Sequence, residues 1–240
     1  MLKIESIVDS ATRYLEGCII RGELKPGQQI KEQEVASSLG ISRPPIREAF
    51  KILEAQGLIT RRPNRGAFVL TITERDAWEI YTLKSALYEL ATRLAFDRIS
   101  EGDMQALEKV VRDMEECVRA EPADVLRYQA LNERYHGIMV EISRHWRLGK
   151  ILQMLHNQVK RYSGMSLTRG EHLRESLDLH IAILRAVKGR DLALAVQLTR
   201  EHISRGLRIV QEIIASENGM SPARVDEVRF LCPEIETQLR

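Results

Sequence analysis

The sequence has few cysteines, few aromatic residues and no long apolar run. Its three cysteines, Cys18, Cys117 and Cys232, are an odd number without close spacing. They predict reduced thiols in a cytoplasmic protein and argue against a disulfide framework. No stretch approaches the roughly 20 apolar residues of a membrane span, and the charged N-terminus is unlike a signal peptide. Aromatic residues make up only 5 % of the chain, and the dominance of Leu, Ile, Ala and Val favours helices.

The sequence also lacks the usual marks of an enzyme. Residues 71–240 contain no glycine-rich phosphate loop, no Ser/His/Asp pattern and no cysteine cluster. We therefore predict no catalytic residues. A length of 240 residues allows one large or two modest domains.

The charge of the chain is small but unevenly distributed. The formal net charge is only +2, yet residues 41–70 carry six basic and two acidic side chains. This excess of positive charge fits either a polyanionic partner or a solvated basic surface.

A helix-turn-helix pattern lies near the start of the chain. A first helix over 32–39 ends at Gly40, and a second begins after Ser42, a residue type that caps helix N-termini well. Pro44 and Pro45 fall in the first turn of the second helix, where backbone N–H groups have no intrahelical partner. The two prolines are therefore expected to start this helix rigidly rather than to break it.

Two short strands are predicted after the helix-turn-helix. The segments LITRR (58–62) and AFVLT (67–71) flank the turn PNRG (63–66). An apolar stripe over 3–21 adds a further helix before them. Residues 1–71 are thus predicted to form a winged helix-turn-helix domain with a small β-hairpin.

Arginines mark the start of the second helix of this motif. A helix N-terminus carries a partial positive charge, so Arg43 there and Arg47 one turn on are unfavourable unless an anion binds. DNA phosphates and guanine edges would offset this charge, and Arg65 at the hairpin tip would reach a neighbouring minor groove. The alternative is a surface helix with incidental arginines.

Residues 72–240 are predicted to form an all-α helical bundle, so that the fold as a whole is mostly α. The connector at 71–75 is short and should couple the two domains. Residues 216–240 contain glycine and two prolines and are predicted to be an irregular tail. Helices are expected over 74–99, 103–119, 123–144, 147–162, 171–188 and 191–215.

Three histidines lie on apolar stripes of three different helices. His136, His180 and His202 are each aligned with aliphatic residues at helical spacing, and Asn132 precedes His136 by one turn. Imidazole is the commonest metal ligand, so these residues indicate a metal site, with ordinary core histidines as the alternative. The remaining histidines, His145, His156 and His172, are interpreted as ordinary polar residues.

The segment GELKPGQQIKEQEVASSLGISRPPIREAFKILEAQGLITRRPNRGAFV (22–69) closely resembles the DNA-reading domain of GntR-type bacterial transcription regulators. Gln33 stands where many members have a basic contact, and Pro44 stands where a threonine often binds phosphate. The resemblance implies a homodimer bound to a palindromic double-stranded DNA operator. The residues it assigns to DNA contact are Gln33, Ser42, Arg43, Pro44, Arg47, Arg65 and Gly66.

The segments NERYH (132–136), LHIAILRAVKGRDLALA (179–195) and EHI (201–203) resemble the FCD effector domain of the FadR-type branch. In that domain an Asp or Asn and three histidines bind a divalent metal. The resemblance implies a metal at Asn132, His136, His180 and His202, with zinc or nickel suited to imidazole ligands. Asn in place of Asp removes a negative charge from the site, which should weaken metal binding.

The same resemblance implies an acidic effector beside the metal. Lys84 stands where members of the branch have an arginine, and Tyr88 stands where they have an acid. Lysine is a point charge and cannot form a bidentate fork with a carboxylate. Arg161 is a second candidate contact for a small carboxylate or hydroxy acid, with a surface arginine as the alternative.

We expect a transcription regulator, and specifically a repressor, rather than an enzyme. A metal-dependent hydrolase in the helical domain is one alternative, because three histidines and an open coordination position also suit metal-assisted hydrolysis. A metal sensor without an organic ligand is the other.

Overall fold

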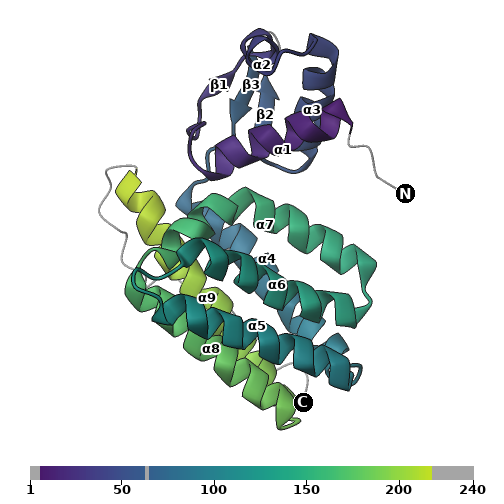
Figure 1. Ribbon diagram of the computed structural model, residues 1–240, viewed down its shortest axis with the longest axis vertical. Coiled ribbons are helices and arrows are strands. Elements are labelled where there is room, and N and C mark those ends of the chain that lie inside the picture. Colours follow the sequence, from purple (N-terminus) through teal and green to yellow (C-terminus); the bar gives the residue numbers. More distant parts are fainter. Residues whose placement is uncertain (1–5, 63–64, 218–240) are drawn as a thin grey trace, which may run out of the picture.

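The computed structural model describes residues 6–62 and 65–217, which form a small N-terminal part and a larger helical part (Figure 1). The small part holds three helices and a three-stranded sheet, and the large part holds six helices within the described residues. No helix in these ranges is both long and apolar enough to cross a membrane. The expected mostly α architecture, with a winged helix-turn-helix followed by a helical bundle, is confirmed.

The helix-turn-helix forms as its sequence predicts. Helix α1 spans Ile7–Ile20 and α2 spans Glu32–Leu39, after which Gly40 takes the left-handed conformation with φ of 65°. Helix α3 spans Arg43–Ala55 and has both prolines in its first turn. Ser42 is the N-cap residue of α3, but its side chain makes no capping hydrogen bond. The expected N-cap position of Ser42 is thus confirmed, and the fixed backbone of the two prolines starts the helix without a side-chain cap.

The sheet has one strand more than the predicted hairpin. Strands β2 (Ile59–Arg62) and β3 (Gly66–Val69) form the hairpin, and β1 (Gln29–Ile30) pairs antiparallel with the other side of β3. The sheet order is therefore β1-β3-β2. A strand of two residues is too short to show an alternating pattern, which is why the sequence did not reveal it.

The helical part matches the six expected helices, with shifts at their ends. Helix α7 continues five residues beyond its expected end at 162, because Leu167 at its C-terminal end packs into a hydrophobic core. Helix α9 reaches Glu217, and the remainder of the predicted tail lies outside the described residues. The helices are α4 (Glu74–Phe96), α5 (Glu101–Arg119), α6 (Val125–Ser143), α7 (Trp146–Leu167), α8 (Gly170–Lys188) and α9 (Leu192–Glu217).

Helix α4 links the small part to the core of the large one. It begins directly after a short connector, where Thr73 and Asp76 form a reciprocal capping box. Ile72 of this connector is buried in a core formed mainly by α4, α7 and α9, while a second core lies mainly among α5, α6 and α8. The polar groups described next lie between these two apolar regions.

Candidate functional site

A basic cleft lies between the start of α3 and the hairpin of the N-terminal part. Its wall includes Gln33 of α2, Arg43 and Arg47 of α3, and Arg65 and Gly66 of the hairpin. These five predicted DNA contacts are thus brought together. The other two, Ser42 and Pro44, lie exposed at the beginning of α3 and are not part of this wall.

A carboxylate of the chain itself pairs with both arginines at the start of α3. One oxygen of Glu32, at the start of α2, lies 2.7 Å from Nε of Arg47 and 3.2 Å from Nη2 of Arg43. Hydrogen bonds from Arg47 and then Arg43 lower the pKa of Glu32, so this shared carboxylate stays ionised. The sequence showed no sign of this contact, because Glu32 and the arginines belong to different helices.

The three predicted histidines meet in the interior of the helical part. His136 of α6, His180 of α8 and His202 of α9 are all buried, and their candidate ligand atoms lie within 4.8 Å of one another. The Nε2 atoms of His136 and His202 are only 3.2 Å apart. Three imidazoles this close together are a suitable donor set for one divalent ion.

The hydrogen bonding of the cluster also fits a metal. His180 donates from Nδ1 to the backbone carbonyl of Ser176 at 2.7 Å, which leaves its Nε2 as an acceptor. That Nε2 and the Oδ1 atom of Asn132 are buried and have no hydrogen-bond partner among the described residues. Burial lowers the pKa of His180 to about 4 and those of His136 and His202 well below the usual value, which keeps all three rings neutral. Neutral imidazole is the form that binds metal.

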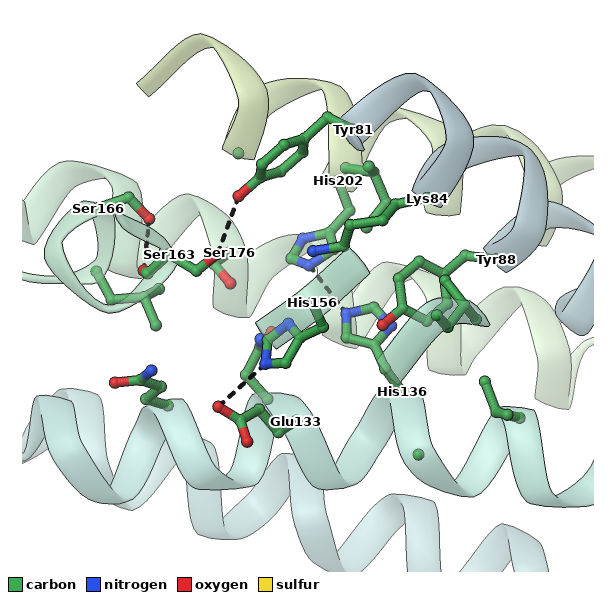
Figure 2. A pocket seen from close by; sticks show the side chains of 18 of the residues that line it. Tyr81, Lys84, Tyr88, Glu133, His136, His156, Ser163, Ser166, Ser176 and His202 are labelled. Carbon is green, nitrogen blue, oxygen red and sulfur yellow. Dashed lines mark hydrogen bonds and ion pairs between the residues drawn. The ribbon is translucent and has the colours of Figure 1, made fainter. Parts of the chain in front are cut away.

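A cavity of about 160 Å³ lies against the histidine cluster (Figure 2). Asn132, His136 and His202 line it, together with Lys84 and Tyr88 of α4, so the structure brings five of our seven predicted metal and effector residues to one place. Of the other two, His180 is fully buried next to His136 and His202, and Arg161 lies elsewhere.

Lys84 is the most unusual charge of this cavity. Its side chain is only 4 % exposed, its Nζ atom lies 4.6 Å from the ring centroid of Tyr81, and the described residues offer it no ion pair. Burial lowers the pKa of Lys84 to about 8, so the amine is still largely protonated at neutral pH. Tyr88 lies beside it, with its ring 4.7 Å from that of His136.

His156 and His172, which we interpreted as ordinary polar residues, line the cavity. His172 is buried and His156 is partly buried. His172 is buried on α8, and Nε2 of His156 on α7 lies 3.3 Å from the carboxylate of Glu133. Burial raises the pKa of Glu133, but His156 and Lys160 outweigh it and hold the pKa at about 2. Our interpretation was wrong for these two histidines, although Leu152 and Val159 on the same face of α7 already placed His156 on an apolar stripe. His145 is exposed at the N-cap of α7, as an ordinary polar residue would be.

The structure does not bring Arg161 to the cavity. Its guanidinium pairs with Glu217 at the end of α9, with an Nη2–Oε1 distance of 2.7 Å, and lies close to Gly22 in the N-terminal part. Arg161 is therefore not a wall residue of the candidate effector site, contrary to our expectation.

Both parts of the chain match known protein families. Residues 7–69 match the bacterial regulatory proteins of the gntR family, and residues 79–205 match the FCD domain. The chain is 29 % identical to the uncharacterized HTH-type transcriptional regulator YdhC of Bacillus subtilis over 203 aligned residues. The aligned region covers 83 % of this chain and 89 % of that protein. It is 28 % identical over 192 residues to the gluconate operon transcriptional repressor of the same organism, covering 75 % and 74 % of the two chains. The structure of Escherichia coli McbR/YncC has the same fold, with a TM-score of 0.74 at 20 % identity over 88 % of this chain and 99 % of that one.

Proposed function

The chain belongs to the GntR family of bacterial DNA-binding transcription regulators with an FCD domain, and from this premise we propose that it is a repressor controlled by a small hydroxy acid. The acid would bind beside a divalent metal in the cavity of the helical part. We further propose a division at residue 71, with DNA binding in residues 1–71 and effector binding in 72–240. A separate hydrophobic core within the N-terminal part supports this division.

We propose that His136, His180, His202 and Asn132 hold the metal ion. Zinc and nickel both suit three imidazoles and one amide oxygen. The support is the convergence of three neutral imidazoles and the two buried acceptors, Nε2 of His180 and Oδ1 of Asn132, that lack partners among the described residues. When bound, the ion would supply a fixed positive charge for an acidic effector.

The buried ammonium group of Lys84 is the single observation that carries the choice of an acid. A buried charge without a counter-ion is costly, and binding of a carboxylate would supply the missing partner. Glu133 in the same wall raises the pKa of Lys84 through its charge, but its carboxylate forms its ion pair with Lys160 at 2.9 Å and none with Lys84. Lys84 and the metal would therefore attract the carboxylate, with the hydroxyl group of Tyr88 beside them.

We propose that Arg43 and Arg47 read the operator from the start of α3. Gln33, Ser42, Pro44, Arg65 and Gly66 would add contacts around them. The support is their placement in or beside one basic cleft of the part that matches the gntR family. Operator binding also implies a cytoplasmic location.

Exposed aliphatic side chains on two neighbouring helices support a homodimer. Leu83 and Leu90 of α4 are 55 % and 40 % exposed, and Ile151 and Met154 of α7 are 44 % and 41 % exposed. Two-fold symmetric dimers are the commonest oligomers, and their symmetry matches a palindromic operator. A second copy packed on this surface would cover these side chains.

The two alternatives are less well supported. The family and the relatives above are transcription regulators, so a hydrolase has no support from the comparisons. A metal sensor without an organic ligand would not need a cavity of about 160 Å³ with a buried lysine in its wall.

Operator affinity with and without an acidic ligand tests the proposal. Metal-loaded protein would be screened by thermal shift against small carboxylic and sugar acids, and operator binding would then be titrated with each ligand. We expect a change of about 5–150-fold in operator affinity. Lys84→Met should weaken ligand binding at least tenfold and leave operator affinity without ligand unchanged.

Lys150→Met is the matched control, because Lys150 is an exposed lysine of α7 outside the cavity wall. Tight ligands that leave operator affinity unchanged in both the wild type and Lys84→Met would show that the cavity is not a regulatory site.

A further inference from the structure

The cavity of the helical part reaches the surface between α6 and α7. Its wall includes one face of each of these helices, and Gln153 of α7 is both a wall residue and exposed to solvent. In Figure 2, Glu133 and His136 point from α6 into the cavity, and His156 lies opposite Glu133. The line along which α6 and α7 meet, which we call the α6–α7 seam, is therefore one boundary between the cavity and solvent.

The α6–α7 seam is closed at two places. At one of them, Gly149 of α7 lies so close to α6 that a Cβ atom on this glycine would be 3.2 Å from Cγ1 of Val140. At the other, the carboxylate of Glu133 on α6 binds Nζ of Lys160 at 2.9 Å and Nε2 of His156 at 3.3 Å. An apolar contact and a group of charges thus seal the seam on either side of its middle.

Between these closures, Gly137 leaves the α6 side of the seam without a side chain. The closures show that α6 and α7 run antiparallel, which places Gly137 near Gln153 of α7. A Cβ atom on Gly137 would lie in open space, with no atom of any other described helix within 4 Å. Glycine is unfavourable inside a helix, and close packing does not require it here. Its effect is to leave an opening in the seam.

Gln153 borders this opening from α7. Its Nε2 atom donates to Oδ1 of Asn157 at 2.7 Å, one turn along the same helix. This hydrogen bond holds the exposed side chain on its own helix, so the side chain can move without breaking that bond's partner away from α6. His136, which precedes Gly137, lines the cavity on the inner side and belongs to the histidine cluster. The opening therefore leads to the candidate metal ligands.

We propose that the opening at Gly137 and Gln153 is the entrance through which small molecules and ions reach the cavity, with the side chain of Gln153 as its gate. The inference rests on the proposed function, which makes this cavity the effector site. Gates of this kind often limit the rates at which ligands enter and leave a protein. An entrance is crossed in both directions, so narrowing or widening it changes the rates of binding and release by the same factor.

Thiol labelling inside the cavity tests the entrance without a metal or an effector. Ser166→Cys places a thiol in the wall at a position that is 3 % exposed, and methyl methanethiosulfonate is a small uncharged thiol reagent. In the full-length protein, peptide mass spectrometry follows labelling at position 166 separately from the native cysteines. Adding Gly137→Leu should slow this labelling about tenfold because the new side chain fills the opening, and adding Gln153→Ala should speed it several-fold.

Gly170→Leu is the matched control for the added leucine. A Cβ atom on Gly170 also lies in open space relative to the other described helices, but Gly170 begins α8 outside the cavity wall. Labelling in this variant should be as fast as in Ser166→Cys alone. Equal rates in Gly137→Leu and Gly170→Leu would overturn the entrance. If leucine at position 137 disturbed the fold, Gln153→Ala would decide, and an unchanged rate in that variant would overturn the gate.

Zinc exchange gives the same comparison for the metal. Uptake of zinc by the metal-free protein and its release to a chelator should both be faster in Gln153→Ala, by the same factor. A change in the metal ligands would instead alter one rate more than the other, and that result would contradict a gate. Failure of zinc to bind at all would overturn the proposed metal site, while thiol labelling would still decide the entrance.

Discussion

At the scale of single residues, the histidine cluster shows how a side chain gains its chemistry from its surroundings. His136, His180 and His202 were selected from apolar stripes, and all three are buried together. His180 donates a hydrogen bond from Nδ1 to the carbonyl of Ser176, which fixes the proton on Nδ1. Its Nε2 atom is therefore the one that would bind a metal. Such second contacts often change metal affinity by about 10–100-fold.

Replacing His180 should remove the metal. We expect the wild type to hold about one divalent ion per chain after dialysis against a weak chelator, and His180→Ala to hold much less because one of the three imidazoles is missing. Elemental analysis measures the content directly. His145→Ala is the control, since His145 is exposed at the N-cap of α7. Equal metal content in wild type and His180→Ala would exclude this site.

At the scale of elements, ion pairs join α2 and α3 into one unit. Pro44 and Pro45 start α3, and the arginines in its first two turns share the carboxylate of Glu32 on α2. The pairs are exposed, so they contribute little to stability. Their effect is to hold two flexible side chains beside each other, facing the basic cleft.

Substitutions in this unit should separate specific from non-specific DNA binding. We expect Arg47→Ala to weaken operator binding by about 1–3 kcal/mol if Arg47 contacts a guanine. Glu32→Gln should instead raise affinity for random DNA and lower the ratio of specific to non-specific binding, because it removes a negative charge that orients both arginines. Titration against operator and random duplexes at two salt concentrations distinguishes these effects.

Lys51→Ala is the control for this series, because Lys51 is an exposed residue of α3 outside the cleft and pairs with Glu48 on its own helix. An Arg47→Ala protein with wild-type affinity for both duplexes would contradict the assignment.

At the scale of the whole molecule, α7 connects the cavity to the N-terminal part (Figure 1). Its residues His156 and Ser163 line the cavity, whereas Gln158 faces Gly57, near the start of β2. A Cβ atom on Gly57 would lie 2.4 Å from Nε2 of Gln158. Ligand binding that shifts α7 would therefore act directly on the part that holds the basic cleft.

Shortening the side chain of Gln158 should weaken the coupling between acid binding in the cavity and operator binding by the N-terminal part. We expect Gln158→Ala to retain its affinity for the acid and its affinity for the operator, while the factor by which the acid changes operator affinity falls several-fold. Coupling is reciprocal, so the effect of operator on acid binding should fall equally. Gln105→Ala, on an exposed position of α5, is the control. A Gln158→Ala protein with undiminished coupling would show that the signal takes another route.

The sequence by itself determined the helices, the hairpin of β2 and β3, and much of the candidate site, but not the two-residue strand β1. Local signals were sufficient for the helices, because caps, prolines and apolar spacing act within one or two turns. They also identified His136, His180 and His202, since a polar residue on an apolar stripe is visible without knowing what the helix packs against. The gntR and FCD resemblances, carried by continuous motifs, were confirmed by the family matches.

Only the tertiary structure decided which side chains meet. Glu32 reaches Arg47 from 15 residues away, Tyr81 reaches Ser163 from 82 residues away, and Arg161 turns to Glu217 rather than to the cavity. His156 and His172 become wall residues of the cavity through the packing of α7 and α8. The periodicity of a helix states which face is apolar, but the partner of a polar group on that face depends on how separate helices pack, and that packing is a property of the whole fold.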